Sequence, residues 1–286
     1  MIGGIEFGGT KCVLAVANNP LDIIEKKIIP TRDPQRTFSD IFLFFNEFKV
    51  DSLGIGIFGP IILNKESSDY GLLVSESKKG WKGINVFSEI SNNITADIKI
   101  DTDVNVAASA EHTYGSGRNC RILVYVTVGT GIGAGVLFDG KPHIGNFHLE
   151  MGHIRVPNQD NFRGVCDIHG DCWEGLASGP SIEARWGIPA VELPNSHEAW
   201  KKEAELLANG LISIIATHSP DRIILGGGVM KQIQLFPMIR KRLGVLWKDY
   251  TPLGPLSKFL VKPGLGSDSG IIGSLIMAEL IRDGKI

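Results

Sequence analysis

The stretch IGGIEFGGTKCVLAVAN (residues 2–18) contains an apolar run, a Gly/Thr turn and a second apolar run. Such a pattern predicts two β-strands joined as a hairpin. The stretch ILVYVTVGTGIGAGVLFDG (residues 122–140) has the same organisation. Strands that are apolar at nearly every position are typical of a sheet covered by helices on both faces. The sequence therefore predicts an α/β protein of two related halves, each beginning with a hairpin whose tip points into a shared cleft.

The remaining elements are expected between and after these hairpins. A short strand is predicted to end at the aspartates that follow residue 98, and residues 251–269, rich in Pro and Gly, are predicted to be irregular. The other expected elements are a buried strand in 52–61, a helix over 104–114 closed by Gly115, a helix over 197–218, a strand from Arg222 and a last helix over 270–282.

Length, charge and cysteine content exclude several classes of protein. The chain has 286 residues, of which 43% are hydrophobic, enough for one large domain or two modest ones sharing a cleft. Its net charge of −2, without a long basic run, gives no electrostatic footprint for nucleic acid or an anionic membrane. The start has no secretion signal, no apolar run reaches the ~20 residues of a membrane span, and four cysteines do not suggest a disulfide scaffold. We expect a cytoplasmic protein.

Three glycine clusters are candidates for contacts with a nucleotide. In the turn at residues 8–11, glycines free backbone N–H groups to face an anion, and Thr10 and Lys11 add donors and charge. The turn at residues 127–133 offers the same, so the two tips suggest a pair of clamps on a polyphosphate, although each could be an ordinary hairpin turn. Neither has a Walker A pattern or opens a helix as a dinucleotide fingerprint does. Glycines 226–228 follow a buried strand and would admit a flat base or serve close strand–helix packing.

Soft and borderline metal ligands cluster in the second half of the chain. Cys166, His169 and Cys172 are three residues apart, and His153 lies a short loop upstream. Four such ligands suit tetrahedral Zn²⁺, and four protein ligands would close the site and make the metal structural. The alternative is chance clustering of ordinary Cys and His side chains. Glu150 and Glu174 flank the cluster, so function is expected at these carboxylates.

Asp103 is the candidate general base. It stands where a strand ends and a helix begins, a place where Asp is commonly a helix N-cap. The helix dipole would keep such a carboxylate ionised, and an ionised carboxylate can accept a proton from a sugar hydroxyl whose oxygen attacks phosphorus. Asn105, Glu150 and Glu174 are polar groups suited to fixing sugar hydroxyls.

These motifs resemble the ROK-type sugar kinases, in particular their bacterial fructokinase branch. The resemblance runs in family order over nearly the whole chain and implies an actin-like, duplicated RNase H-like fold of two lobes with an interlobe cleft. It also implies ATP-dependent phosphorylation of a hexose, with Mg²⁺ carried by the nucleotide. The motifs are GIEFGGTK (4–11), FGP (58–60), DTDVN (101–105), TVGTGIGAG (127–135), EMGH (150–153), CDIHGDCWEGLASGP (166–180) and the glycines at 226–228.

The resemblance also assigns roles to individual residues. It implies Asp103 as general base, and a small lobe of residues 1–112 plus 273–286 against a large lobe of 113–272 with the zinc-binding loop. By the same resemblance, phosphate is bound by Gly9, Thr10, Lys11, Thr130 and Gly131, adenosine by Gly227 and Gly228, sugar hydroxyls by Asn105, Glu150 and Glu174, and zinc by His153, Cys166, His169 and Cys172.

Five positions depart from the family pattern. Phe7 stands where a small residue is usual, and Leu149 where a proline is expected. Val106 and Ala134 replace the usual Ala and Gly, and Glu6 stands where other branches have Asp. A carboxylate as long as that of Glu6 could still hold a metal-bound water.

The expected activity is that of a fructokinase, converting D-fructose and ATP to D-fructose 6-phosphate and ADP. A kinase for another hexose, such as mannose or glucose, and a non-catalytic sugar-binding relative are the alternatives. A sugar-responsive repressor is disfavoured, because the first glycine turn begins at residue 8 with no helix-turn-helix before it. The resemblance allows a homodimer, although no interface can be identified in the sequence.

Overall fold

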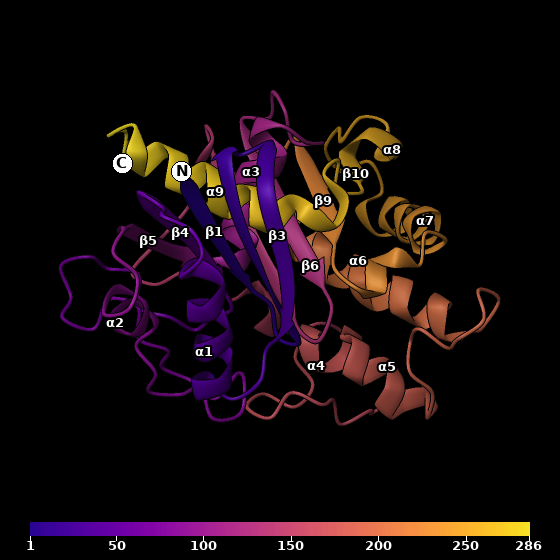
Figure 1. Ribbon diagram of the computed structural model, residues 1–286. Coiled ribbons are helices and arrows are strands. Elements are labelled where there is room, and N and C mark those ends of the chain that lie inside the picture. Colours follow the sequence, from indigo (N-terminus) through magenta and orange to yellow (C-terminus); the bar gives the residue numbers. More distant parts are fainter.

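The computed structural model describes residues 1–286 and contains two five-stranded sheets with helices packed around them (Figure 1). The first sheet has the order β3-β2-β1-β4-β5 and the second the order β10-β9-β6-β7-β8. The strands of the first are β1 (Ile2–Phe7), β2 (Lys11–Asn19), β3 (Asp22–Pro30), β4 (Ser52–Ile57) and β5 (Asp97–Thr102). Those of the second are β6 (Ile122–Val128), β7 (Ile132–Phe138), β8 (Lys141–Pro142), β9 (Arg222–Gly226) and β10 (Leu260–Val261).

The two sheets repeat one topology, which confirms the predicted duplication and the α/β class. In the first, β1 pairs antiparallel with β2 and parallel with β4. In the second, β6 pairs antiparallel with β7 and parallel with β9. Most residues of these hairpin strands are buried, as their continuous apolar runs predicted.

The helices cover both sheets, and two of them contact elements of both halves. They are α1 (Pro34–Phe45), α2 (Val86–Ser91), α3 (Asp103–Thr113), α4 (Trp173–Ala177), α5 (Gly179–Trp186), α6 (Ala199–His218), α7 (Leu235–Trp247), α8 (Leu256–Phe259) and α9 (Ser269–Arg282). Helix α3 packs against β4 and β5 of the first sheet and β6 and β7 of the second. Helix α9 packs on the first sheet and along α3 (Figure 1). None of the helices combines the length and apolar character required to cross a membrane.

The prediction of an irregular segment over residues 251–269 was right for residues 251–255 and 262–265 but wrong for the rest. It holds α8 and β10, and β10 adds an edge strand to the second sheet by pairing parallel with β9. Only two residues long, β10 is formed because β9 offers it an unpaired edge, and no local pattern signals that.

Backbone contacts at glycines seat the first turn of α3. A Cβ atom on Gly273 of α9 would lie 1.8 Å from the carbonyl oxygen of Val106, and one on Gly135 of β7 would lie 2.6 Å from that of Val104. A Cβ atom on Gly56 of β4 would lie 2.4 Å from the Val106 side chain. Elements of both halves therefore fix the position of the turn that begins with Asp103.

We predict that Gly273→Ala destabilises the protein by more than ~3 kcal/mol, because its methyl group would overlap backbone that cannot move without separating α9 from α3. Gly244→Ala is the matched control, since it is also inside a helix but its Cβ would meet only a Leu256 methyl at 3.7 Å. The control should stabilise by about 0.5–1 kcal/mol. Urea unfolding measures both, and equal effects would contradict the proposed close packing.

Candidate functional site

The first turn, between β1 and β2, presents unpaired backbone donors. Its carbonyl oxygens are occupied: Thr31 donates its hydroxyl to Gly8 O (2.9 Å) and its N–H to Thr10 O (3.0 Å). The ammonium of Lys78 donates to Gly9 O (2.7 Å). The N–H groups of Gly9 and Thr10 have no partner in the protein. Adjacent free N–H groups on a turn can bind an anion. Phosphate binding by this turn stays a prediction.

The second turn, between β6 and β7, has the same design. The N–H of Gly129 is satisfied within the turn by Gly131 O (2.8 Å), and Gly129 O accepts from Gly179 N (2.7 Å). The N–H groups of Thr130 and Gly131 are unpaired. The two tips also meet, because a Cβ atom on Gly9 would lie 2.8 Å from the Thr130 hydroxyl oxygen. The paired anion sites therefore converge on one place.

The third glycine cluster, residues 226–228, fits both interpretations that the sequence left open, close packing and space for a flat base. Gly227 has φ +92°, and a Cβ atom there would lie 2.3 Å from Val128 O, so this glycine serves close packing against the second turn. Gly228 is exposed and faces open space, with no atom within 4 Å of its Cβ position. A flat group could lie against it.

Asp103 is the first residue of α3, and the interpretation of it as the N-cap was wrong. The cap is Thr102, whose hydroxyl oxygen accepts from Asn105 N (3.2 Å). Burial raises the pKa of Asp103 to about 6, against the opposing effect of the hydrogen bond from Val104 N (2.9 Å). The rise in pKa caused by burial is thus larger than the fall caused by the N-terminus of the helix. A carboxyl group with this pKa is still mostly ionised at pH 7.

Other carboxylates converge on Asp103. Burial, followed by the charge of Asp103, raises the pKa of Glu6 to about 7, and Glu6 Oε2 is buried without a hydrogen-bond partner. Partial burial, followed by the charges of Glu174 and Asp103, raises the pKa of Glu150 to about 7. Glu174 accepts from Ile132 N (2.8 Å) and so rests on the second turn. Acidic groups from four segments thus face the place where the turns meet.

Asn105 is held from behind by a residue that the sequence did not single out. Its Nδ2 donates to Asp101 Oδ1 (2.7 Å), and both side chains are buried. A Cβ atom on Gly135 would lie 2.8 Å from Asn105 Oδ1, so the amide is also packed closely against β7. Its contact with a sugar stays a prediction.

His148 is a second residue that sequence reasoning missed. Its Nε2 accepts from Ile61 N (3.0 Å), in the segment after β4, and burial lowers the pKa of the ring. The proton of this neutral ring therefore sits on Nδ1, which lies 3.5 Å from Glu150 Oε1. His148 thus connects the first half of the chain to Glu150. No residue spacing signals this role, because it depends on a partner 87 positions away.

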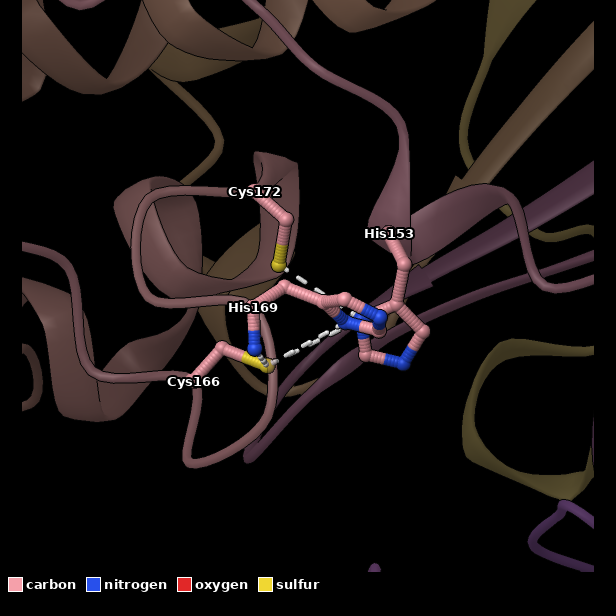
Figure 2. A group of neighbouring side chains, drawn as sticks. All are labelled: His153, Cys166, His169 and Cys172. Atoms are coloured by element: carbon pink, nitrogen blue, oxygen red, sulfur yellow. Dashed lines mark hydrogen bonds between the residues drawn. The ribbon is translucent and has the colours of Figure 1, made fainter.

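The four predicted metal ligands come together (Figure 2). Their ligand atoms lie within 4.8 Å of one another. His153 Nδ1 lies 3.4 Å from Cys172 Sγ and 3.8 Å from Cys166 Sγ, and His169 Nδ1 lies 3.8 Å from Cys166 Sγ. Tetrahedral zinc, with bonds of about 2.3 Å to sulfur and 2.0 Å to nitrogen, places such ligands about 3.6 Å apart. The donor set and its spacing could hold this ion.

The cluster joins the segments that carry the two flanking glutamates. Cys172 is the N-cap of α4, its sulfur accepting from Gly175 N (3.4 Å), and Glu174 stands in the first turn of that helix. His153 ends a 3₁₀ turn that Glu150 precedes. An ion bound by both segments would fix the distance between the two glutamates.

Two of the departures from the family pattern, Phe7 and Leu149, belong to hydrophobic cores, whereas Glu6 lies near Asp103. Phe7 is fully buried and packs edge-on against Trp81 (5.8 Å between ring centroids) and Phe38 (6.3 Å) in the core below the first sheet. Leu149 packs against the core of the second half. Neither side chain occupies the space above the first turn.

Comparison with known proteins finds similarity over nearly the whole chain. The model of the ROK family matches residues 2–280. A putative fructokinase of Bacillus subtilis is 40% identical over 285 residues, covering 98% of this chain and 95% of that protein. A fructokinase of Pediococcus pentosaceus is 35% identical over 281 residues, covering 98% of each. A ROK family glucokinase from Streptomyces griseus, solved in complex with glucose and AMPPNP, shares the fold with a TM-score of 0.78 at 20% identity, covering 97% of this chain and 99% of that one.

Proposed function

The chain belongs to the ROK family, and from this premise we propose that it is an ATP-dependent fructokinase that forms D-fructose 6-phosphate and ADP. The observation that carries the proposal is the convergence of Asp103, Glu150 and Glu174 on the place where two turns with free N–H groups meet. A carboxylate beside an anion site suits proton removal from an attacking hydroxyl. Fructose is the preferred acceptor because the relatives at 35–40% identity are named fructokinases.

The reaction follows from these positions. The turns of Gly9–Lys11 and Thr130–Gly131 hold the phosphates, and Gly227 and Gly228 lie along the adenosine. Glu150, Glu174 and Asn105 fix the sugar hydroxyls. The 6-hydroxyl oxygen forms a bond to the γ-phosphorus while the bond from that phosphorus to ADP breaks, and Asp103 accepts the hydroxyl proton.

Glu6 is suited to a cation that accompanies the nucleotide. Its buried Oε2 has no hydrogen-bond partner in the protein. Glu6 lies close enough to Asp103 for the charge of Asp103 to raise its pKa. A Mg²⁺ ion bound to the phosphates would supply neutralisation of their charge. Glu6 would orient water on such an ion, near Asp103.

The four-ligand cluster is proposed as a structural zinc site of His153, Cys166, His169 and Cys172. Its support is the ligand chemistry and the sulfur–nitrogen spacing. Such an ion would hold Glu150 and Glu174 at a constant separation and would take no part in phosphoryl transfer. The division into lobes of residues 1–112 plus 273–286 and 113–272, and a homodimer, stay predictions.

Asp103→Asn is expected to lower kcat by about 10²–10⁴-fold, because an amide cannot accept the proton. Sugar-dependent ADP release should be measured with fructose, mannose, glucose and N-acetylglucosamine. Asp97→Asn is the matched control, an exposed aspartate at the start of β5, the strand that ends immediately before Asp103, and it should retain full activity. If turnover is faster with mannose or glucose than with fructose, that sugar replaces fructose as the proposed substrate. Fructose binding without turnover in the wild-type protein would favour the sugar-binding alternative.

The pH dependence should report Asp103. Its folded-state pKa is about 6, and only the ionised form can act as base. We expect kcat/KM for fructose to be highest near pH 8 and to fall at least tenfold per pH unit well below pH 6, because Glu6 and Glu150, each with a pKa of about 7, are protonated before Asp103 as the pH falls. Circular dichroism and metal content at each pH distinguish titration from unfolding. A flat profile down to pH 5 in folded protein would be inconsistent with Asp103 as the base.

Loss of the metal cluster should weaken both stability and activity. Cys166→Ser removes one ligand, so we expect loss of stoichiometric zinc and a fall of more than ~5 °C in Tm, since each kcal/mol is worth about 2–4 °C at this size. Cys120→Ser is the control, because Cys120 lies outside the cluster. The two variants are compared by metal analysis, thermal unfolding and KM for fructose. A protein purified without zinc and fully active would refute the structural role.

A further inference from the structure

The segment between β4 and α2 is anchored beneath the first turn by Trp81. This side chain is fully buried, and its Nε1 donates to Arg32 O (2.9 Å). Its ring packs edge-on against Phe7 (5.8 Å between centroids) and Phe58 (5.4 Å). Phe7 immediately precedes the first turn, so the segment has a defined position relative to that turn.

Lys78, three residues before Trp81, directs its ammonium at the first turn. Its Nζ donates to Gly9 O (2.7 Å), which leaves two N–H donors unused. Every ion pair within 4.0 Å involves other residues, so no carboxylate neutralises this cation. Partial burial lowers the pKa of Lys78, with no opposing charge to raise it. A half-buried cation without a counter-ion beside free N–H groups is an arrangement that an anion would complete.

The position of Gly9 indicates which part of a nucleotide this anion is. Gly9 is where the two turns touch, at Thr130. Glu174 accepts a hydrogen bond from Ile132 N on the second turn, and Glu150 feels the charges of Glu174 and Asp103. A polyphosphate held by both turns would therefore have its terminal group here, next to the acceptor and its base. Adenosine and the inner phosphates would extend from that point toward Gly228. The Lys78 ammonium therefore lies at the transferring end.

We propose that Lys78 is a catalytic residue that contacts the phosphoryl group during its transfer, and this inference rests on the proposed kinase function. As the sugar oxygen bonds to phosphorus and the bond to ADP breaks, the three equatorial oxygens remain negatively charged. Lys78 neutralises that charge while keeping its own proton, and Asp103 alone accepts the hydroxyl proton. Before nucleotide binds, the ammonium is held ready by Gly9 O.

The same segment provides matched controls. Lys79 and Lys82 are exposed lysines on either side of Gly80 and Trp81 and make no hydrogen bond or ion pair. Their substitution removes the same charge from the same segment without touching the first turn. A general electrostatic effect would be shared by all three lysines, whereas a direct contact is confined to Lys78.

The test compares Lys78→Met, Lys78→Arg and Lys79→Met with the wild-type protein in fructose phosphorylation. We expect Lys78→Met to lower kcat by about 10²–10³-fold, as loss of one transition-state donor does, with KM for fructose and Tm unchanged. Lys78→Arg should retain part of the rate, and Lys79→Met all of it. Titration calorimetry adds a second readout: Lys78→Met should bind ADP alone normally but bind ADP with aluminium fluoride and fructose at least tenfold more weakly.

Each contrary result has a separate meaning. Unchanged kcat in Lys78→Met overturns the inference and leaves the kinase function intact. If Lys78→Met raises only the KM for fructose, Lys78 contacts the sugar and not the phosphoryl group. If the variant binds ADP and the aluminium fluoride complex equally more weakly, Lys78 shapes the turn. Either result overturns the inference. Absence of hexose turnover in the wild-type protein refutes the proposed function itself.

Discussion

The close approach of the first turn of α3 to neighbouring backbone is the constraint on which the rest of the structure depends. Gly273 and Gly135 let α9 and β7 reach the carbonyls of Val106 and Val104 at distances that no side chain would permit. Since α9 lies on the first sheet and β7 belongs to the second, the two halves are joined through this turn. Asp103 stands at its start, so the proposed general base is fixed by the same contacts that hold the halves together.

Charge around this turn is arranged in two opposed sets. Glu6, Asp103 and Glu150 share a partly buried region, and each has its pKa raised chiefly by burial. Facing them are the unpaired N–H groups of the two hairpin tips and the ammonium of Lys78. No lysine or arginine forms an ion pair within 4.0 Å with Glu6, Asp103 or Glu150, and no carboxylate forms one with Lys78. A ligand that brings phosphate to one and hydroxyl groups to the other would satisfy both, which is the chemistry of a sugar kinase.

Two separate features of the structure fix the position of Glu150. His148 connects it to the Ile61 backbone in the first half of the chain, and the His/Cys cluster connects its segment to Glu174 in the second half. The first depends on a hydrogen bond between the halves, and the second on the proposed metal site within one half. The carboxylate proposed to face the sugar is thus positioned relative to both sides of the site.

The sequence by itself determined the features that are local in the chain. The paired hairpins, their glycine turns and the ligand spacing of Cys166, His169 and Cys172 are all short-range patterns, and the structure has each of them. The tertiary structure decided what depends on partners far apart in sequence: Thr102 rather than Asp103 as the helix cap, β10 at the edge of β9, His148 beside Ile61, and Lys78 beneath Gly9. Burial decided the pKa of Asp103 as well, because desolvation depends on what packs around a carboxylate and not on its neighbours in the chain.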